Sequence, residues 1–175
     1  SIDKRRLFEV SPSGALGCLV CGLANGSFWA MAPVFTSSIS SGTTLAAWFM
    51  TSAVVGGAIS QWPLGLLSDK VSRRAVLVSI TLGGCAVGIA MSYLAPNLTF
   101  VGANLLAALW GAMAFPLYTI SVAYTNDRAE AHEYVTVSSG LLLMYGVGAI
   151  LGPFIASVLI TFRNPGELFL FSALA

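Results

Sequence analysis

No charged residue occurs between Val10 and Ser68, in the stretch VSPSGALGCLVCGLANGSFWAMAPVFTSSISSGTTLAAWFMTSAVVGGAISQWPLGLLS. Two further stretches, 75–126 and 134–162, also lack charged side chains. A helix that crosses a lipid bilayer needs roughly 20 mostly apolar residues. The first two stretches are therefore each long enough for two spans with a turn between them, and the third fits one span.

The composition agrees with a membrane protein, because 57% of the residues are hydrophobic and only 9% are charged. A soluble domain usually has about 25% charged residues, enough to cover a surface that faces water. A surface that faces lipid needs no such cover, so we expect the lipid bilayer as a partner. The chain has no basic patch interleaved with aromatic residues, and we expect no nucleic acid partner.

Polar and turn-forming residues divide the chain into spans. We expect helices over about 14–35, 45–67, 75–94, 98–124 and 135–162, and an incomplete sixth helix over 168–175. The chain does not begin with Met, which suggests a fragment or an internal start, and residues 1–9 form a polar segment before the first span. The predicted fold class is an all-α membrane domain over residues 10–175.

The basic residues predict the orientation of these spans, since Lys and Arg are concentrated in cytoplasmic loops. With the expected helix count, seven of the eight Lys and Arg residues fall on the side of the N-terminus: Lys4, Arg5, Arg6, Lys70, Arg73, Arg74 and Arg128. Only Arg163 falls on the other side. The pattern predicts a plasma-membrane protein, in bacteria an inner-membrane one, with its N-terminal side in the cytoplasm.

Cys18 and Cys21 form a C-x-x-C pair, a spacing that can serve redox chemistry or a metal. Both lie inside an apolar segment with no second pair and no nearby His. We therefore interpret them as small buried thiols, and we expect no metal and no cofactor. The chain also lacks a nucleophile with a paired base, so an enzyme is not expected.

Several glycines lie four residues apart, a spacing that lets membrane helices approach closely. The pairs are Gly22 with Gly26, Gly84 with Gly88, and Gly148 with Gly152. This spacing predicts a tightly packed helix bundle, and it does not by itself predict transport.

The segment between the second and third spans carries a more specific pattern, GLLSDKVSRRAVL over residues 65–77. It resembles the loop signature of the major facilitator superfamily, Gly-x-Leu-Ala-Asp-Arg-x-Gly-Arg-Arg/Lys-x-x-Leu. The matching residues are Gly65, Leu67, Asp69, Arg73, Arg74 and Leu77, while Lys70 keeps the charge of the usual Arg and Ser72 replaces the usual Gly. In this family the resemblance implies a conformational switch: Gly65 allows two helices to meet closely, and the charged residues form a latch that favours the outward-open state.

A second pattern, Gly148-Ala-Ile-Leu-Gly152-Pro153, resembles the helix-five signature of the same superfamily. The alternative is a simple packing kink, because Gly-Pro kinks occur in many membrane helices. Three further segments resemble the second half of transporters of the YcaD-like branch: 61–65, 117–118 and 141–153. The resemblance implies helices seven to twelve, the last one incomplete, with residues 1–9 ending the cytoplasmic loop that joins the two halves. The partner it implies is the other six-helix half.

Such transporters bind solute near the bilayer midplane, between the two halves. Polar and aromatic residues within the expected spans are therefore candidates for the substrate path: Asn25, Trp29, Gln61, Asn104, Tyr118 and Tyr145. The alternative for each is a hydrogen bond between helices, worth about 0.6–2 kcal/mol in membranes.

The function indicated by these patterns is transport of a small solute by alternating access, as a secondary transporter. The alternative is a membrane scaffold or sensor that keeps the fold without transport. No Asp, Glu, Lys, Arg or His lies in the middle of an expected span, so this half has no visible proton relay. A partner half in the complete gene would favour transport, and a long soluble domain there would favour the sensor.

Overall fold

The computed structural model describes residues 12–39, 43–130 and 133–162, and these are almost entirely helical. The long helices are α2 (Pro12–Ile39), α3 (Thr43–Lys70), α4 (Arg73–Leu94), α5 (Phe100–Asn126) and α6 (Tyr134–Phe162). A single 3₁₀ turn, η1 (Ala95–Asn97), joins α4 to α5. All five helices are long and apolar enough to cross a membrane. The expected sixth span, 168–175, lies outside the described residues, as do residues 1–9.

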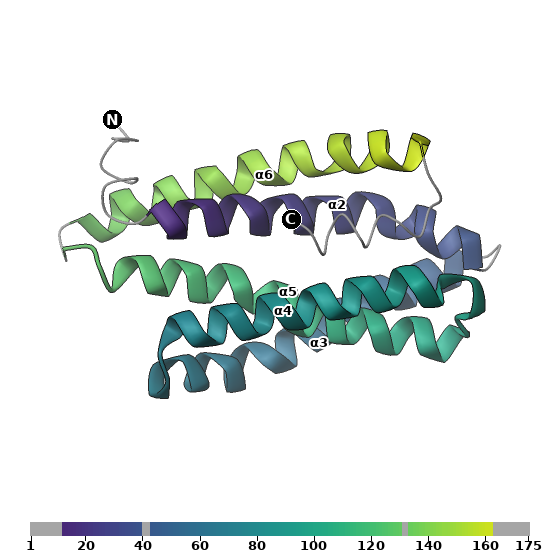
Figure 1. Ribbon diagram of the computed structural model, residues 1–175, viewed down its shortest axis with the longest axis horizontal. Coiled ribbons are helices and arrows are strands. Elements are labelled where there is room, and N and C mark those ends of the chain that lie inside the picture. Colours follow the sequence, from purple (N-terminus) through teal and green to yellow (C-terminus); the bar gives the residue numbers. More distant parts are fainter. Residues whose placement is uncertain (1–11, 40–42, 131–132, 163–175) are drawn as a thin grey trace.

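The five helices run side by side along the longest axis of the molecule (Figure 1). α2 lies against α6, and α3 lies against α5. α2, α4 and α6 run in one direction, while α3 and α5 run in the other (Figure 1). The two closest pairs, α2–α6 and α3–α5, are therefore parallel pairs.

Glycines bring the parallel helices together. A Cβ added to Gly22 of α2 would overlap the Tyr145 carbonyl of α6, and one added to Gly148 would overlap the Leu19 carbonyl. Gly56 and Gly111 play the same role between α3 and α5. In lipid there is little hydrophobic drive between helices, so close backbone contact supplies the van der Waals attraction that holds them together.

Two of the three predicted glycine pairs therefore pack against each other, Gly22/Gly26 on α2 and Gly148/Gly152 on α6. Gly84 of the third pair behaves differently. A Cβ added to Gly84 would make only an ordinary contact, 3.6 Å from the Met113 Cβ atom. Spacing alone did not distinguish this glycine from those that touch a neighbouring backbone.

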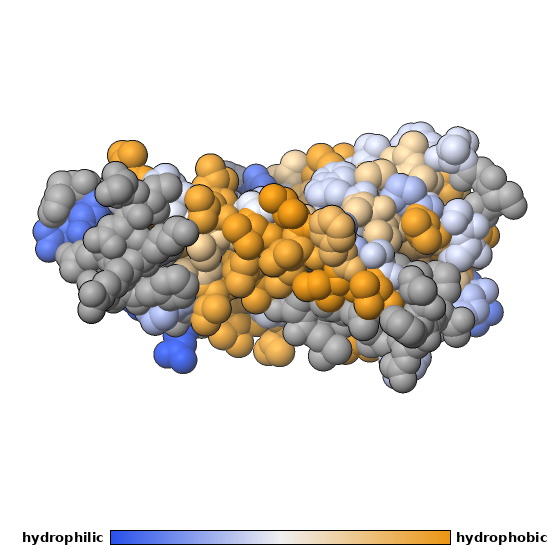
Figure 2. Space-filling model, turned by 90° about the horizontal axis from the view of Figure 1, so that it is seen from above, coloured by the Kyte–Doolittle hydropathy of each residue, from blue (hydrophilic) through white to orange (hydrophobic). Residues whose placement is uncertain are grey.

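Aromatic side chains fill the core where α2, α3 and α5 meet. The ring of Phe28 stacks on Trp110 with centroids 4.1 Å apart, and it also stacks on Phe49 at 5.8 Å. All three residues are buried. Figure 2 shows apolar side chains across the middle of the molecule and hydrophilic ones mainly toward its ends, as a bilayer requires.

The connection between α3 and α4 is shorter than the sequence suggested. We expected a loop over 68–74, but α3 continues through Asp69 and Lys70, and α4 begins at Arg73. Only Val71 and Ser72 lie between the two helices. Ser72 has φ −59°, which does not require glycine, and its side chain accepts a hydrogen bond from the Ala75 N–H. Serine suits this position because it is a favoured N-cap residue.

Candidate functional site

Arg73 joins three helices at one end of the bundle. Its Nη2 atom lies 3.0 Å from Oδ1 of Asp69, in the last turn of α3. Its Nε atom lies 2.7 Å from Oδ2 of Asp127, the C-cap residue of α5. We call Asp69, Arg73 and Asp127 the charged cluster.

Each member of the charged cluster is at an unfavourable end of its own helix. A helix carries partial positive charge at its N-terminus and partial negative charge at its C-terminus. Arg73 begins α4, whereas Asp69 ends α3 and Asp127 caps the C-terminus of α5. Pairing between the helices offsets this local cost, so the cluster depends on the three helix ends being together.

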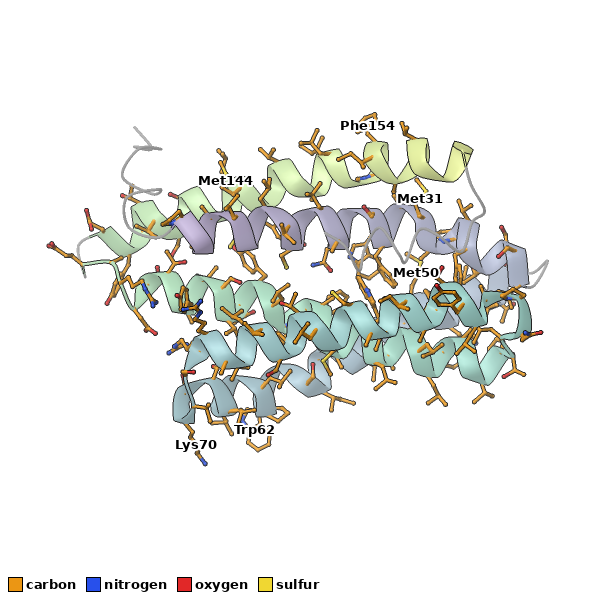
Figure 3. The ribbon with its side chains drawn as sticks, viewed as in Figure 1. Met31, Met50, Trp62, Lys70, Met144 and Phe154 are labelled. Carbon is orange, nitrogen blue, oxygen red and sulfur yellow. The ribbon has the colours of Figure 1, made fainter. Side chains whose placement is uncertain are left out.

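The other basic side chains at this end lie around the cluster. Lys70 is exposed in the last turn of α3 and projects away from the bundle (Figure 3). Arg74 is exposed and lines a groove of about 550 Å³ between α2, α4 and α5. The guanidinium carbon of Arg128 lies 3.7 Å from the centroid of the Tyr124 ring. Every Lys and Arg among the described residues is thus at the same end of the bundle.

The signature implied that Gly65 allows two helices to meet closely. No atom of the described residues lies within 4 Å of a Cβ added at this position, so none of the described helices approaches it closely. Close packing of two helices at Gly65 stays a prediction, because none of the described helices provides it.

The Gly148–Pro153 motif lies within α6, which continues as a helix from Tyr134 to Phe162. Gly148 and Gly152 both face α2, where a Cβ would overlap the carbonyls of Leu19 and Leu23. The two glycines therefore allow α6 to pack closely against α2.

Three of the six predicted path residues take part in contacts between aromatic rings. Trp29 of α2 stacks on Phe115 of α5 with ring centroids 6.0 Å apart, and Tyr118 of α5 meets Tyr145 of α6 at 4.9 Å. Phe115 and Tyr118 are three residues apart and so share a face of α5.

Phe115 was not predicted as a path residue. Nothing in its local sequence separates it from the other nine Phe residues. Phe115 lies three residues before Tyr118, which places both on one face of a helix, and this spacing is the sequence feature that could have identified it. Its contact with α3 could not be read from the sequence: a Cβ added to Gly57 would overlap the Phe115 ring.

Asn25 lies on α2, one helical turn before Trp29. It is 3% exposed, and its Nδ2 atom donates a hydrogen bond of 3.1 Å to the Cys21 carbonyl. Its Oδ1 atom is buried and accepts no hydrogen bond from any described residue. A buried amide oxygen without a donor costs about 1–3 kcal/mol, which makes this atom unusual.

The remaining two candidates for the substrate path, Asn104 and Gln61, take no part in these contacts between aromatic rings. Asn104 accepts a hydrogen bond of 3.1 Å from the Ser52 hydroxyl and lines a separate groove of about 390 Å³ between α3 and α5. This is the interhelical hydrogen bond that we considered as the alternative. Gln61 is exposed on α3, one turn beyond Gly57, so it borders the Phe115 side of that helix.

The two cysteines of the C-x-x-C pair are buried in the described part of the chain. The Cys21 thiol faces the Ala114 carbonyl, with 3.9 Å between sulfur and oxygen. Within residues 12–39, 43–130 and 133–162, no three His, Cys, Asp or Glu residues group as a metal site would require.

Comparison with known proteins gives one family. A family model described as "Major Facilitator Superfamily" matches residues 14–175. The chain is 30% identical over 163 residues to an "Uncharacterized MFS-type transporter YcaD" of Salmonella arizonae, covering 91% of this chain and 40% of that protein. Proteins of the same description from Salmonella paratyphi B and Salmonella newport are 29% identical with the same coverage. The chain thus spans about 40% of the length of these curated relatives. No solved structure gives a significant match.

Proposed function

The chain belongs to the major facilitator superfamily, and from this we propose that it forms one half of a transporter that moves a small solute by alternating access. The relatives are described as transporters, and this chain covers 40% of their length. We assign it to the second half, with a six-helix first half as its partner. The solute path would run between the two halves, near the bilayer midplane.

The observation that carries this proposal is the charged cluster. Its members Asp69 and Arg73 occupy positions of the superfamily signature, and the contact with Asp127, outside the signature, lets one arginine join the ends of α3, α4 and α5. Asp69 and Asp127 are more than half exposed, and ion pairs in such settings contribute about 0.2–1 kcal/mol each. Two such pairs can bias a two-state equilibrium several-fold without locking it, which is what a reversible latch requires.

The cluster also supports an assignment of the sides of the membrane. All described Lys and Arg residues gather at its end of the bundle, and basic residues favour the cytoplasm. We propose that this end is cytoplasmic, that the protein resides in a plasma membrane such as the bacterial inner membrane, and that the intact cluster favours the outward-open state.

A flux screen of the full-length protein in lipid vesicles tests the proposal. Uptake and efflux of small solutes would be measured with and without a pH gradient. We expect solute-specific flux that falls in an Arg73→Gln variant of normal abundance. Correctly inserted protein that moves no solute in either direction would favour the alternative of a scaffold or sensor.

A further inference from the structure

A pair of polar side chains connects α5 to α6 beside the charged cluster. The Nδ2 atom of Asn126 donates a hydrogen bond of 3.2 Å to the Ser138 hydroxyl, and this hydroxyl lies 3.4 Å from its acceptor, the Asn126 Oδ1 atom. We call these two residues the polar clasp. We propose that they are positioning residues that couple the charged cluster to α6, so that opening the cluster moves α6. This inference rests on the proposed function, because it extends the proposed latch to a further helix.

The arrangement of the helices leaves α6 without a member of the charged cluster. Asp69, Arg73 and Asp127 belong to α3, α4 and the C-cap of α5. α6 lies mainly against α2, whereas α3 and α4 lie against α5 (Figure 1). A change in the cluster therefore needs a connection at the end of α5 before it can displace α6.

Asn126 provides this connection, because it is the last residue of α5 and directly precedes Asp127. The backbone N–H groups of Asp127 and Arg128 donate hydrogen bonds to carbonyls in the last turn of α5. The Arg128 side chain also donates a hydrogen bond of 2.9 Å to the Tyr124 carbonyl and lies over the ring of the same residue. Since these contacts brace the end of the helix, a displacement of Asp127 with Arg73 also displaces Asn126.

Ser138 passes this displacement into the packed part of α6. Its neighbour Val137 is buried in a cluster with Ala15 and Cys18 of α2. Ser138 and Tyr145 are seven residues apart, so they lie two turns from each other on one face of α6. Tyr145 is one of the predicted path residues. The polar clasp therefore connects the charged cluster with the helix face that carries a residue of the expected path.

The chemistry of the polar clasp suits a reversible coupling. Asn126 and Ser138 are both half-buried, and an amide and a hydroxyl can each donate and accept, so they pair without charge. The loss of one such hydrogen bond alters an equilibrium by roughly two- to tenfold. A contact of this strength can bias two states of the helix bundle without locking either of them.

Distances between two spin labels in the full-length protein test the coupling without any solute. The labels are attached at Val78→Cys in α4 and Val135→Cys in the first turn of α6, both exposed positions, in a variant without other accessible cysteines. Double electron–electron resonance in lipid nanodiscs gives the population at each distance. We expect Asp127→Asn, which weakens the contact with Arg73, to shift the ratio of two populations by up to roughly fivefold.

The polar clasp predicts that this response depends on Asn126 and Ser138. In the Ser138→Ala and Asn126→Ala backgrounds, Asp127→Asn should leave the ratio unchanged, because α6 no longer follows the end of α5. Ser138→Thr keeps the hydroxyl and should restore the response. Thermal unfolding of each variant shows whether it is folded.

Ser139→Ala is the matched control, because the Ser139 hydroxyl is exposed and donates a hydrogen bond of 2.9 Å to the Thr136 carbonyl of its own helix. This variant should respond to Asp127→Asn as the original protein does. The assignment is overturned if Asp127→Asn does not shift the ratio in the original protein, if the shift persists in Ser138→Ala, or if Ser139→Ala abolishes it equally.

Solute flux in vesicles separates this inference from the proposed function. A response that depends on Ser138, without flux of any solute in the screen, would support the polar clasp and contradict transport. Solute flux together with a response that persists in Ser138→Ala would support transport and contradict the polar clasp.

Discussion

The Nε atom of Arg73 lies 2.7 Å from Oδ2 of Asp127, and this pair joins the first residue of α4 to the cap of α5. The same guanidinium contacts Asp69 through Nη2 at 3.0 Å. Two carboxylates on two helices are thus held through different nitrogen atoms of one side chain. A single ammonium group cannot reproduce this arrangement, since it lacks the planar fork of donors.

Arg73→Lys should therefore lower the transport rate although it keeps the charge. We expect a decrease of roughly two- to tenfold, which corresponds to losing one or both weak ion pairs. The rate would be measured as solute flux per molecule of full-length protein in vesicles.

Arg74→Lys is the matched control for this change. Arg74 is the next residue on α4, is exposed, and forms no ion pair with a described residue. Its replacement should change the rate by less than about twofold, because most exposed substitutions stay within about 0.5 kcal/mol. Equal losses in the two variants would argue that the rate does not depend on the two ion pairs of Arg73.

Asp69→Asn should shift the conformational equilibrium toward the inward-open state. It removes one of the two carboxylates that contact Arg73, a change of about 0.2–1 kcal/mol that alters a two-state ratio by up to about fivefold. We expect slower turnover with normal insertion, and faster labelling of a Thr119→Cys reporter from the cytoplasmic side. Unchanged flux and unchanged labelling would mean that Asp69 is only a solvated residue at a helix end.

Gly22→Ala and Gly148→Ala should each destabilise the packing of α2 against α6. At both positions an added methyl group meets backbone atoms of the facing helix, which cannot move aside as a flexible side chain can. Overpacking of this kind costs about 1–3 kcal/mol. Thermal unfolding of the full-length protein in detergent would measure the loss.

Gly65→Ala and Gly146→Ala provide controls for the glycine changes, because no atom in the described part of the chain lies within 4 Å of a Cβ at either position. Both should unfold at or slightly above the original temperature, since alanine is a better helix former than glycine. If all four variants were destabilised alike, the close approach of α2 and α6 would not be the cause.

The ends of the bundle should face opposite sides of the membrane. Single cysteines at Val71 and Asn97, both exposed, would report the two ends in a variant that lacks Cys18, Cys21 and Cys85. An impermeant thiol reagent outside intact cells should label position 97 and leave position 71 unlabelled. Labelling of position 71 from outside would reverse the proposed orientation.

The sequence by itself determined the number of described helices and their approximate limits. The expected span 45–67 corresponds to α3 at Thr43–Lys70, and 135–162 corresponds to α6 at Tyr134–Phe162. This succeeded because a bilayer solvates each helix separately, so length and hydropathy along the chain are enough to define a span. The signature at 65–77 likewise identified the family, which the family model confirms.

Only the tertiary structure decided which residues meet. Three contacts join segments that are far apart in the sequence. Arg73 pairs with Asp127, Trp29 stacks on Phe115, and Gly22 packs against α6. These contacts are set by how each helix is rotated about its axis, and spans that are apolar on all sides leave that rotation undefined. Packing between helices fixes it, because only some rotations bring glycine against backbone and arginine against carboxylate.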